Sequence, residues 1–144
     1  MTDLRVRALQ YLTRREHSRA ELHAKLAAHA DSEEALTALL DALQAERLLS
    51  DSRYASQRIA ARAGRYGNGR LRQELRQKGL ADSDIEAALP EAGNEAERCR
   101  SIWRKKFGHP PLSAEERAKQ MRFLQYRGFS AEAIRQTLRG TDEE

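Results

Sequence analysis

Hydrophobic residues recur along most of the chain at intervals of three and four residues, which is the spacing of one buried face of an α-helix. Short stretches rich in glycine, proline, serine and aspartate separate these runs. β-Branched residues are scarce, whereas strong helix formers are abundant. The third helix is expected to end near residue 49, and residues 90–94 to form a linker. The pattern predicts an all-α protein with nine helices, which begin near residues 3, 18, 31, 50, 70, 82, 96, 113 and 130.

One hydrophobic pattern occurs twice, with a constant offset of 49 residues. A basic residue, Lys78 or Arg127, precedes the glycine of each copy. Repetition at such a period is typical of proteins built from stacked supersecondary units, which work by presenting a long surface rather than a catalytic pocket. The two copies consist of Leu75, Gly79, Leu80, Ile85 and Leu89, and of Leu124, Gly128, Phe129, Ile134 and Leu138.

The two repeated glycines are expected to end helices. Glycine adopts positive φ without a Cβ clash, so Gly79 and Gly128 are placed just past the caps of their helices. The leucine four residues before each glycine and the hydrophobic residue after it then form the apolar contact of a Schellman-type stop. A β-branched residue at either glycine should therefore lower the free energy of unfolding by more than about 1 kcal/mol.

Nine helices in groups of three give three tandem, helix-turn-helix-like repeats, expected at residues 1–49, 50–92 and 93–144 and arranged as an elongated monomer. The first repeat departs from the others, because aligning its Glu21 with Glu74 puts Leu26 at the position of the glycine. Serine residues at predicted helix starts support the grouping. The expected caps are Ser18, Ser50, Ser113 and Ser130, with capping boxes at Ser18 and Ser113.

The composition fits thin helical cores rather than one deep core, since 40% of the residues are hydrophobic, 6% aromatic and 33% charged. A net charge of +4 and an isoelectric point near 9.5 favour polyanions or acidic proteins as partners. No secretory signal opens the chain, and no run of 18 apolar residues occurs. The sequence therefore predicts a cytoplasmic protein that does not enter a membrane.

Charge is distributed unevenly along the chain. Residues 51–80 carry eight basic and two acidic side chains, a net charge of +6, and residues 98–127 carry nine basic and two acidic ones, a net charge of +7. Residues 81–97, between these blocks, carry six acidic side chains and no basic one. Solvated helix faces with ion pairs four residues apart explain such blocks most simply. The alternative is a polyanionic partner, because crowded like charges otherwise cost stability.

The crowding is densest on the predicted fifth helix. At 100° per residue, Arg72 and Arg76 share one face of this helix, so they are the best single candidates for a partner contact. The basic residues of this helix, with only Glu74 among them, are Arg70, Arg72, Arg76 and Lys78. A secondary basic patch follows at Arg104, Lys105 and Lys106.

The glycine-rich loop at residues 65–70 allows two interpretations. One is a flexible turn between helices. The other is a phosphodiester contact made by Arg65, Arg70 and the backbone N–H groups of the turn. Tyr66 could stack on a base or seal the contact between modules. No Gly-Lys-Ser/Thr sequence follows, which argues against nucleotide binding.

Catalysis, metal binding and cofactor binding are not expected. The four histidines do not have ligand spacing with Cys99 and are interpreted as solvated or capping residues. Acidic pairs lie in the first turns of helices, where they favour the helix dipole. Cys99 lies on the apolar face of its helix and is expected to be an inert core thiol. The histidines are His17, His23, His29 and His109.

Five sequence blocks carry further information: RREHSRAEL at 14–22, ERLLSDSRYA at 46–55, RYGNGRLRQELRQKGL at 65–80, WRKKFG at 103–108 and QMRFLQYRGFS at 120–130. Together and in this order, they resemble the RecX family, the bacterial regulators of the RecA recombinase. The resemblance covers nearly the whole chain. One departure is Asn68, where the family often has proline before the basic helix.

The resemblance implies three tandem three-helix repeats without catalytic activity or a cofactor, which bind the RecA nucleoprotein filament along its helical groove. Such a protein alters filament assembly or ATP hydrolysis, usually downward, and thereby tunes recombination and the SOS response. DNA within the filament is a further candidate partner. We expect the filament contact at Arg65, Arg70, Arg72, Arg76 and Lys78, with the secondary basic patch as the next candidate.

The competing hypothesis is a stand-alone, sequence-nonspecific DNA-binding protein that uses the basic helices. Such a protein would hold naked DNA tightly, with a steep dependence on salt concentration. A filament regulator would instead bind the protein filament much better than DNA alone.

Overall fold

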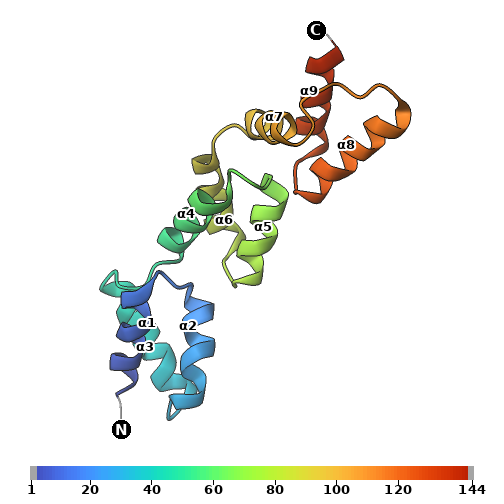
Figure 1. Ribbon diagram of the computed structural model, residues 1–144. Coiled ribbons are helices and arrows are strands. Elements are labelled where there is room, and N and C mark those ends of the chain that lie inside the picture. The colour runs from blue at the N-terminus through green and yellow to red at the C-terminus, as the bar shows by residue number, and fades with distance from the viewer. Residues whose placement is uncertain (1–2, 143–144) are drawn as a thin grey trace. The chain divides into compact units, whose positions relative to one another are not determined.

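The computed structural model describes residues 3–142, with side chains up to residue 139, and this part of the chain is all-helical and contains no strand (Figure 1). The helical prediction is therefore confirmed. No helix in this part is both long and apolar enough to cross a membrane. Two short 3-10 helices are η1 (Ala27–His29) and η2 (Leu89–Ala92). The α-helices are α1 (Leu4–Arg14), α2 (Arg19–Leu26), α3 (Glu33–Ala45), α4 (Asp51–Arg62), α5 (Asn68–Gln77), α6 (Asp82–Ala88), α7 (Glu95–Lys106), α8 (Ala114–Tyr126) and α9 (Ala131–Asp142).

Helix starts follow the predicted serine caps. Ser18 forms a complete capping box with Glu21 at the start of α2. Ser113 accepts a hydrogen bond from the Glu116 N–H, but the Glu116 carboxylate accepts from the Leu112 N–H rather than from the cap. Only half of this second predicted capping box is therefore present. The hydroxyl oxygen also accepts from the N–H three residues later, at 3.1 Å, at the two other predicted caps, Ser50 and Ser130.

Three boundaries differ from the prediction. The third helix, α3, ends at Ala45 rather than near residue 49, because Arg47 has a φ of 63° and turns the chain. The fifth helix, α5, begins earlier than predicted, at Asn68, whose N–H donates to Glu95 Oε2 at 2.7 Å. The predicted linker at 90–94 contains part of η2, and its last residue caps α7.

The glycine stops are present as predicted. Gly79 has a φ of 81° and Gly128 a φ of 91°. The Leu80 N–H donates to the Leu75 carbonyl oxygen at 3.3 Å, and the Gly79 N–H donates to the carbonyl oxygen three residues earlier at 2.9 Å. The corresponding distances around Gly128 are 3.2 and 2.9 Å. Both turns therefore carry the two hydrogen bonds of the Schellman motif.

The helices pack into two compact units. The first comprises the described residues up to Gln57 together with Leu75–Ala87, and the second comprises Arg58–Glu74 together with the described residues from Ala88 onward. The divisions fall inside α4, α5 and α6, so these three helices contribute residues to both units.

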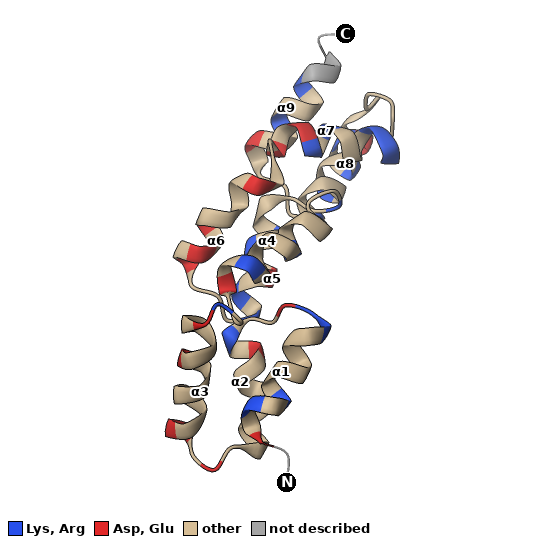
Figure 2. Ribbon diagram, turned by 90° about the vertical axis from the view of Figure 1, so that its left-hand side faces the viewer, with Lys and Arg blue, Asp and Glu red and all other residues tan. Residues whose placement is uncertain are grey.

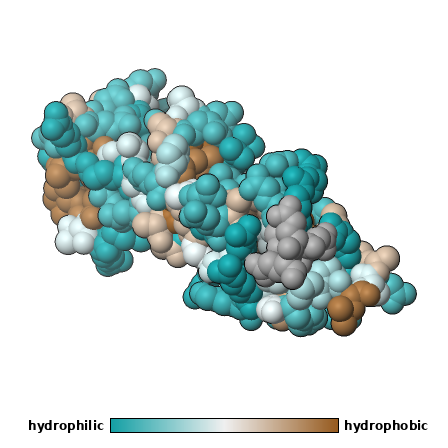
Figure 3. All heavy atoms as spheres, turned by 90° about the horizontal axis from the view of Figure 1, so that it is seen from above, coloured by the Kyte–Doolittle hydropathy of each residue, from teal (hydrophilic) through white to brown (hydrophobic). Residues whose placement is uncertain are grey.

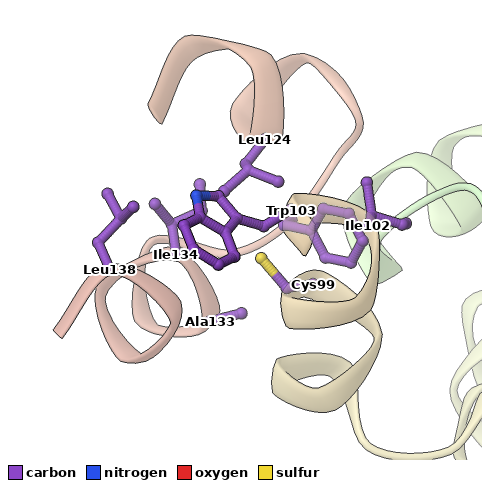
Figure 4. Close-up of a cluster of buried hydrophobic side chains, with 8 residues drawn as sticks. Cys99, Ile102, Trp103, Leu124, Ala133, Ile134 and Leu138 are labelled. Carbon is purple, nitrogen blue, oxygen red and sulfur yellow. The ribbon is translucent and has the colours of Figure 1, made fainter. Parts of the chain in front are cut away.

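Each unit has its own hydrophobic core. In the second unit, Cys99, Leu124 and Ile134 lie around the Trp103 indole (Figure 4). The indole Nε1 donates to the buried Gln120 Oε1 at 2.8 Å, a polar core contact that the hydrophobic pattern does not predict. The buried core of the first unit includes Ala8, Leu22, Leu26, Leu36, Leu40, Leu43 and Leu49.

The start of α2 is held in the first unit by two hydrogen bonds and a close backbone approach. Ser18 Oγ donates to the Lys78 carbonyl oxygen at 2.7 Å, and the Arg19 N–H donates to Asp51 Oδ1 at 2.7 Å. A Cβ at Gly79 would lie 2.4 Å from a side-chain carbon of α2. The α2 start therefore packs against the end of α5 because position 79 has no side chain.

The start of α5 is held in the second unit in the same way. The Gly67 N–H donates to the Arg127 carbonyl oxygen at 2.9 Å, and the Asn68 N–H donates to Glu95 at 2.7 Å. A Cβ at Gly128 would lie 2.6 Å from a backbone nitrogen of α5. In both units, two groups hold the start of the helix. One is the carbonyl of the basic residue before the glycine, and the other is an acidic side chain at the first position of another helix.

These paired contacts correct the predicted alignment of the first repeat. Ser18 takes the place of Gly67, so the offset of 49 extends back into the first repeat. The alignment of Glu21 with Glu74 is therefore wrong by four residues. Ala30 is the counterpart of the repeated glycine, and its φ of −86° requires no glycine.

His17 also differs from its prediction, because it is buried rather than solvated, with 1% of its surface exposed. Its Nδ1 lies 3.1 Å from the Arg15 carbonyl oxygen, and its Nε2 lies 2.9 Å from Lys25 Nζ. A neutral ring with the proton on Nδ1 satisfies both partners. Burial lowers the pKa of His17, and the Arg15 and Lys25 charges lower it further. The Arg15 carbonyl and the Glu21 carboxylate oppose this shift.

The free energy of unfolding should therefore decrease when the pH is lowered from about 7.5 to about 5.5. Unfolded His17 takes up a proton near its usual pKa of about 6.5, whereas the folded protein resists protonation, so acid favours the unfolded state. Thermal unfolding at the two pH values measures this effect. His17→Gln should flatten the pH dependence, and His29→Gln, at an exposed position, should leave it unchanged. An equal pH dependence in wild type and His17→Gln would contradict the assignment.

Candidate partner-binding surface

The basic side chains predicted to bind a partner are divided between the two units. Arg65, Arg70 and Arg72 belong to the second unit, and Arg76 and Lys78 belong to the first.

In the first unit, both predicted contacts are paired with acids. Arg76 Nε lies 2.9 Å from Asp82 Oδ1, and Lys78 Nζ lies 4.0 Å from Glu21 Oε2. Burial alone would raise the pKa of Glu21, but hydrogen bonds from Arg15 and the Ser18 N–H lower it to about 2. This carboxylate is therefore charged at neutral pH.

In the second unit, Glu74 is shared by two arginines. Arg62 donates to its two carboxylate oxygens at 2.6 and 2.7 Å, and Arg70 Nε lies 3.4 Å from Oε1. Burial alone would raise the pKa of Glu74, but Arg62 and Arg70 lower it. Repulsion among the cations of α5 is thus relieved by ion pairs, and crowding alone is no argument for a partner at Arg70, Arg76 or Lys78.

Tyr66 is surrounded by guanidinium groups. The Cζ atoms of Arg62, Arg70 and Arg127 lie 4.6, 4.7 and 5.5 Å from its ring centroid. Its carbonyl oxygen accepts a hydrogen bond from Arg98 at 3.0 Å. Because guanidinium groups already lie over the ring, the structure favours the sealing role over base stacking.

The loop between α4 and α5 is held by its own backbone. The N–H groups of residues 65–69 all donate within the protein, two to the last turn of α4 and three to α7 and the turn after α8. None of these five groups is left for a phosphate, which argues against the predicted cradle of backbone N–H groups. The loop is a hydrogen-bonded turn rather than a flexible one.

Side chains from the two predicted basic sites meet at one hollow in the second unit. Arg65 lines it together with Lys105 and Lys106, which the sequence places in a separate patch. Arg104, the third member of that patch, does not line it. The hollow has a volume of about 500 Å³, and we call it the basic hollow. Its lining residues are Gly64, Arg65, Tyr66, Ile102, Lys105, Lys106, Phe123 and Arg127.

Among the aromatic and basic residues that line the basic hollow, Phe123 and Arg127 are not predicted from the sequence as partner contacts. Arg127 Cζ lies 5.1 Å from the Phe123 ring centroid and 5.5 Å from that of Tyr66. Its Nη1 donates to the Arg65 carbonyl oxygen at 3.2 Å. The internal repeat could have indicated Arg127, because Arg127 stands at the position of Lys78, and Lys78 is one of the contacts predicted from the sequence.

The cations of the basic hollow differ from those of α5 in their lack of counter-charge. Among residues 3–139, no acidic side chain forms an ion pair with Arg65, Lys105, Lys106 or Arg127. Acidic residues gather instead on α6, and basic residues occupy the last turn of α7 (Figure 2). Four uncompensated cations around one hollow favour an anionic partner.

Large exposed hydrophobic side chains are few in the described part of the chain. On the face drawn in Figure 3, hydrophilic residues dominate and hydrophobic residues form separate patches. The arrangement therefore fits a charged partner better than an extended apolar one. Large exposed hydrophobic side chains in the described part of the chain are Val6, Leu48, Leu112 and Tyr126.

The one cysteine is not placed for reactivity. Cys99 is buried, as predicted, and burial raises the pKa of its thiol. The side chains that the structure describes include no group of three His, Cys, Asp or Glu residues able to hold a metal ion.

Two protein-family models match the chain. The model for the second three-helix domain of RecX matches residues 50–89, and the model for the third three-helix domain matches residues 94–138. Both ranges lie inside predicted repeats.

Relatives named regulatory protein RecX match over almost the whole chain. The regulatory protein RecX of Leptothrix cholodnii is 49% identical over 98% of this chain and 90% of its own length. The regulatory protein RecX of Ralstonia pickettii is 46% identical over 97% of this chain and 89% of its own length.

Crystal structures show the same fold. RecX from Lactobacillus salivarius superimposes with a TM-score of 0.84 at 21% identity, over 98% of this chain and 96% of that structure. A second regulatory protein RecX superimposes with a TM-score of 0.74 at 26% identity, over 96% of this chain and 72% of that structure. With its two domain matches and its nearly full-length identity to these relatives, the chain belongs to the RecX family of regulatory proteins.

Proposed function

We propose that this chain binds the RecA nucleoprotein filament and lowers RecA-driven ATP hydrolysis, thereby restraining recombination and the SOS response. Its relatives are named as regulatory proteins, and the resemblance carried by its sequence blocks implies RecA as the regulated partner. Such a regulator needs no catalytic residue, because it shifts an equilibrium by binding one state of its partner better than another. We expect it to act as a cytoplasmic monomer.

The basic hollow is the observation that best supports an interaction with a nucleoprotein. A nucleoprotein filament offers a regular array of phosphates, and the hollow offers Arg65, Lys105, Lys106 and Arg127 without acidic partners. We therefore propose the hollow as the main contact of the second unit. Additional proposed contacts in that unit are Arg70, Arg72 and Arg104, the last of which precedes Lys105 in the sequence. In the first unit, the additional proposed contacts are Arg76 and Lys78.

A stand-alone DNA-binding protein is the second candidate function, and the same uncompensated cations favour it. The two functions differ in what happens when DNA is in excess. A protein that only coats DNA would inhibit RecA by competing for the strand, so added DNA would relieve the inhibition. A filament regulator would remain bound to the filament.

RecA-driven ATP hydrolysis on single-stranded DNA tests the proposal. Titration with this protein should lower the rate, and a several-fold excess of added single-stranded DNA should not restore it. An unchanged rate at saturating protein would refute regulation of ATP hydrolysis. Full recovery with excess DNA would favour the stand-alone DNA-binding protein.

A further inference from the structure

We propose that the basic hollow is a phosphodiester-binding site for a nucleic-acid strand, with Arg127 as its central ligand. The inference deepens the proposed function, because the strand it assigns is the DNA of the RecA filament. All parts of the site belong to the second unit, and they come from the α4–α5 loop, α7, α8 and the residue after α8.

Arg127 is held in place before any ligand arrives. Its guanidinium lies near two aromatic rings, with Cζ 5.1 Å from the Phe123 centroid and 5.5 Å from the Tyr66 centroid. Its Nη1 donates to the Arg65 carbonyl oxygen at 3.2 Å, which fixes one edge of the group. A guanidinium fixed in this way loses little conformational entropy on binding and retains N–H groups for a bidentate contact.

The other cations of the hollow complete a site with more charge than one carboxylate could neutralise. Lys105 and Arg65 are exposed, and Lys106 Nζ lies 5.3 Å from the Phe123 ring centroid. In contrast, Arg62 and Arg70 line no part of the hollow and are engaged by Glu74. The four cations that line the hollow thus have no acidic partner among residues 3–139.

The chemistry of the site favours a nucleic-acid strand over an acidic peptide. Four cations supplied by three segments fit a partner that repeats its charge along a backbone. Arginine binds phosphate through two parallel N–H donors, which suits the pre-oriented Arg127. An acidic peptide of RecA is the alternative that the experiment separates.

Binding of a fluorescein-labelled oligothymidine to the full chain tests the site directly. Arg127→Lys keeps the charge but removes the planar fork, so it should weaken binding by about fivefold or more. Arg122→Lys is the matched control, because Arg122 is exposed on α8 and does not line the hollow. It should leave the affinity within about twofold of wild type, as expected for a charge-conserving change. Equal effects of the two substitutions would overturn the inference.

A second variant keeps the test independent of the folding of Arg127→Lys. Lys105→Gln alters only an exposed side chain and should reduce the slope of log affinity against log salt by about 0.7, the value of one single-strand phosphate contact. An unchanged slope would overturn the inference, as would weaker binding of both variants to DNA-free RecA with unchanged binding to the oligonucleotide. Because these assays use naked oligonucleotide, their failure is distinct from a failure to regulate RecA.

Discussion

Gly128→Ala should lower the free energy of unfolding by about 3 kcal/mol, because it adds dihedral strain and overpacking at the same residue. Gly128 has a φ of 91°, where a Cβ is unfavourable. The added carbon would also lie 2.6 Å from the Arg70 backbone nitrogen and 2.4 Å from the Arg70 Cβ. Neither atom can move away by a side-chain rotation, so α5 must shift from its contact with the turn.

Substitutions at three other glycines allow the cost of positive φ to be measured separately from the cost of overpacking. Gly93 has a φ of 83° but no neighbour within 4 Å, Gly67 meets backbone atoms at 2.5 Å without a positive φ, and Gly64 meets neither condition. Alanine should therefore cost about 1 kcal/mol at Gly93, about 2 kcal/mol at Gly67 and almost nothing at Gly64. Urea unfolding followed by circular dichroism measures all four variants. If Gly128→Ala is as stable as Gly93→Ala, the close approach of α5 to position 128 adds no cost, and the packing argument is wrong.

Arg65→Glu/Lys105→Glu should remove most of the inhibition of RecA-driven ATP hydrolysis, through a loss of filament affinity of about tenfold or more. Both side chains line the basic hollow without acidic partners, so the substitution replaces attraction to an anionic filament with repulsion. Exposed charges contribute little to stability, so the melting temperature should remain close to that of wild type. Titration of the ATP hydrolysis rate with each variant gives the measurement.

Arg72→Glu/Arg76→Glu is the matched comparison, because it reverses two charges on α5, the helix that the sequence alone favours. Arg76 is already paired with Asp82, so its charge is less available to a partner. We expect this variant to lose less inhibition than Arg65→Glu/Lys105→Glu. The assignment to the hollow fails if the α5 variant is inactive while the hollow variant inhibits RecA as wild type does.

Local chemistry explains why much of the fold could be predicted from the sequence. The stops at Gly79 and Gly128 depend on φ and on residues within five positions, and a serine cap depends on an N–H three residues away. Hydrophobic spacing likewise identifies the buried faces, because a helix repeats every 3.6 residues. These signals lie within one or two helical turns of the residues that they position.

The contacts of the candidate site depend on partners far away in the sequence. The carboxylate that lies 4.0 Å from Lys78 belongs to Glu21, and the carbonyl oxygen that accepts from Arg127 belongs to Arg65, 62 residues earlier, but only the first of these contacts changes the net charge offered to a partner. The linear sequence gives the number of cations and not their pairing. The prediction for His17 is wrong for the same reason, since its burial depends on contacts with Tyr11 of α1 and Lys25 of α2.

The repeat boundaries after residues 49 and 92, the elongated shape and the monomeric state stay predictions. Small-angle X-ray scattering measures the last two together, because an elongated monomer and a compact sphere of equal mass differ in radius of gyration.

Co-sedimentation provides the most direct test of the central claim that the filament is the partner. The wild-type protein is centrifuged separately with single-stranded DNA, with DNA-free RecA and with RecA–DNA filaments at physiological salt. We predict that it sediments with the filaments far more than with either component. Equal recovery with naked DNA and with filaments would contradict the claim and leave the protein as a DNA-binding protein.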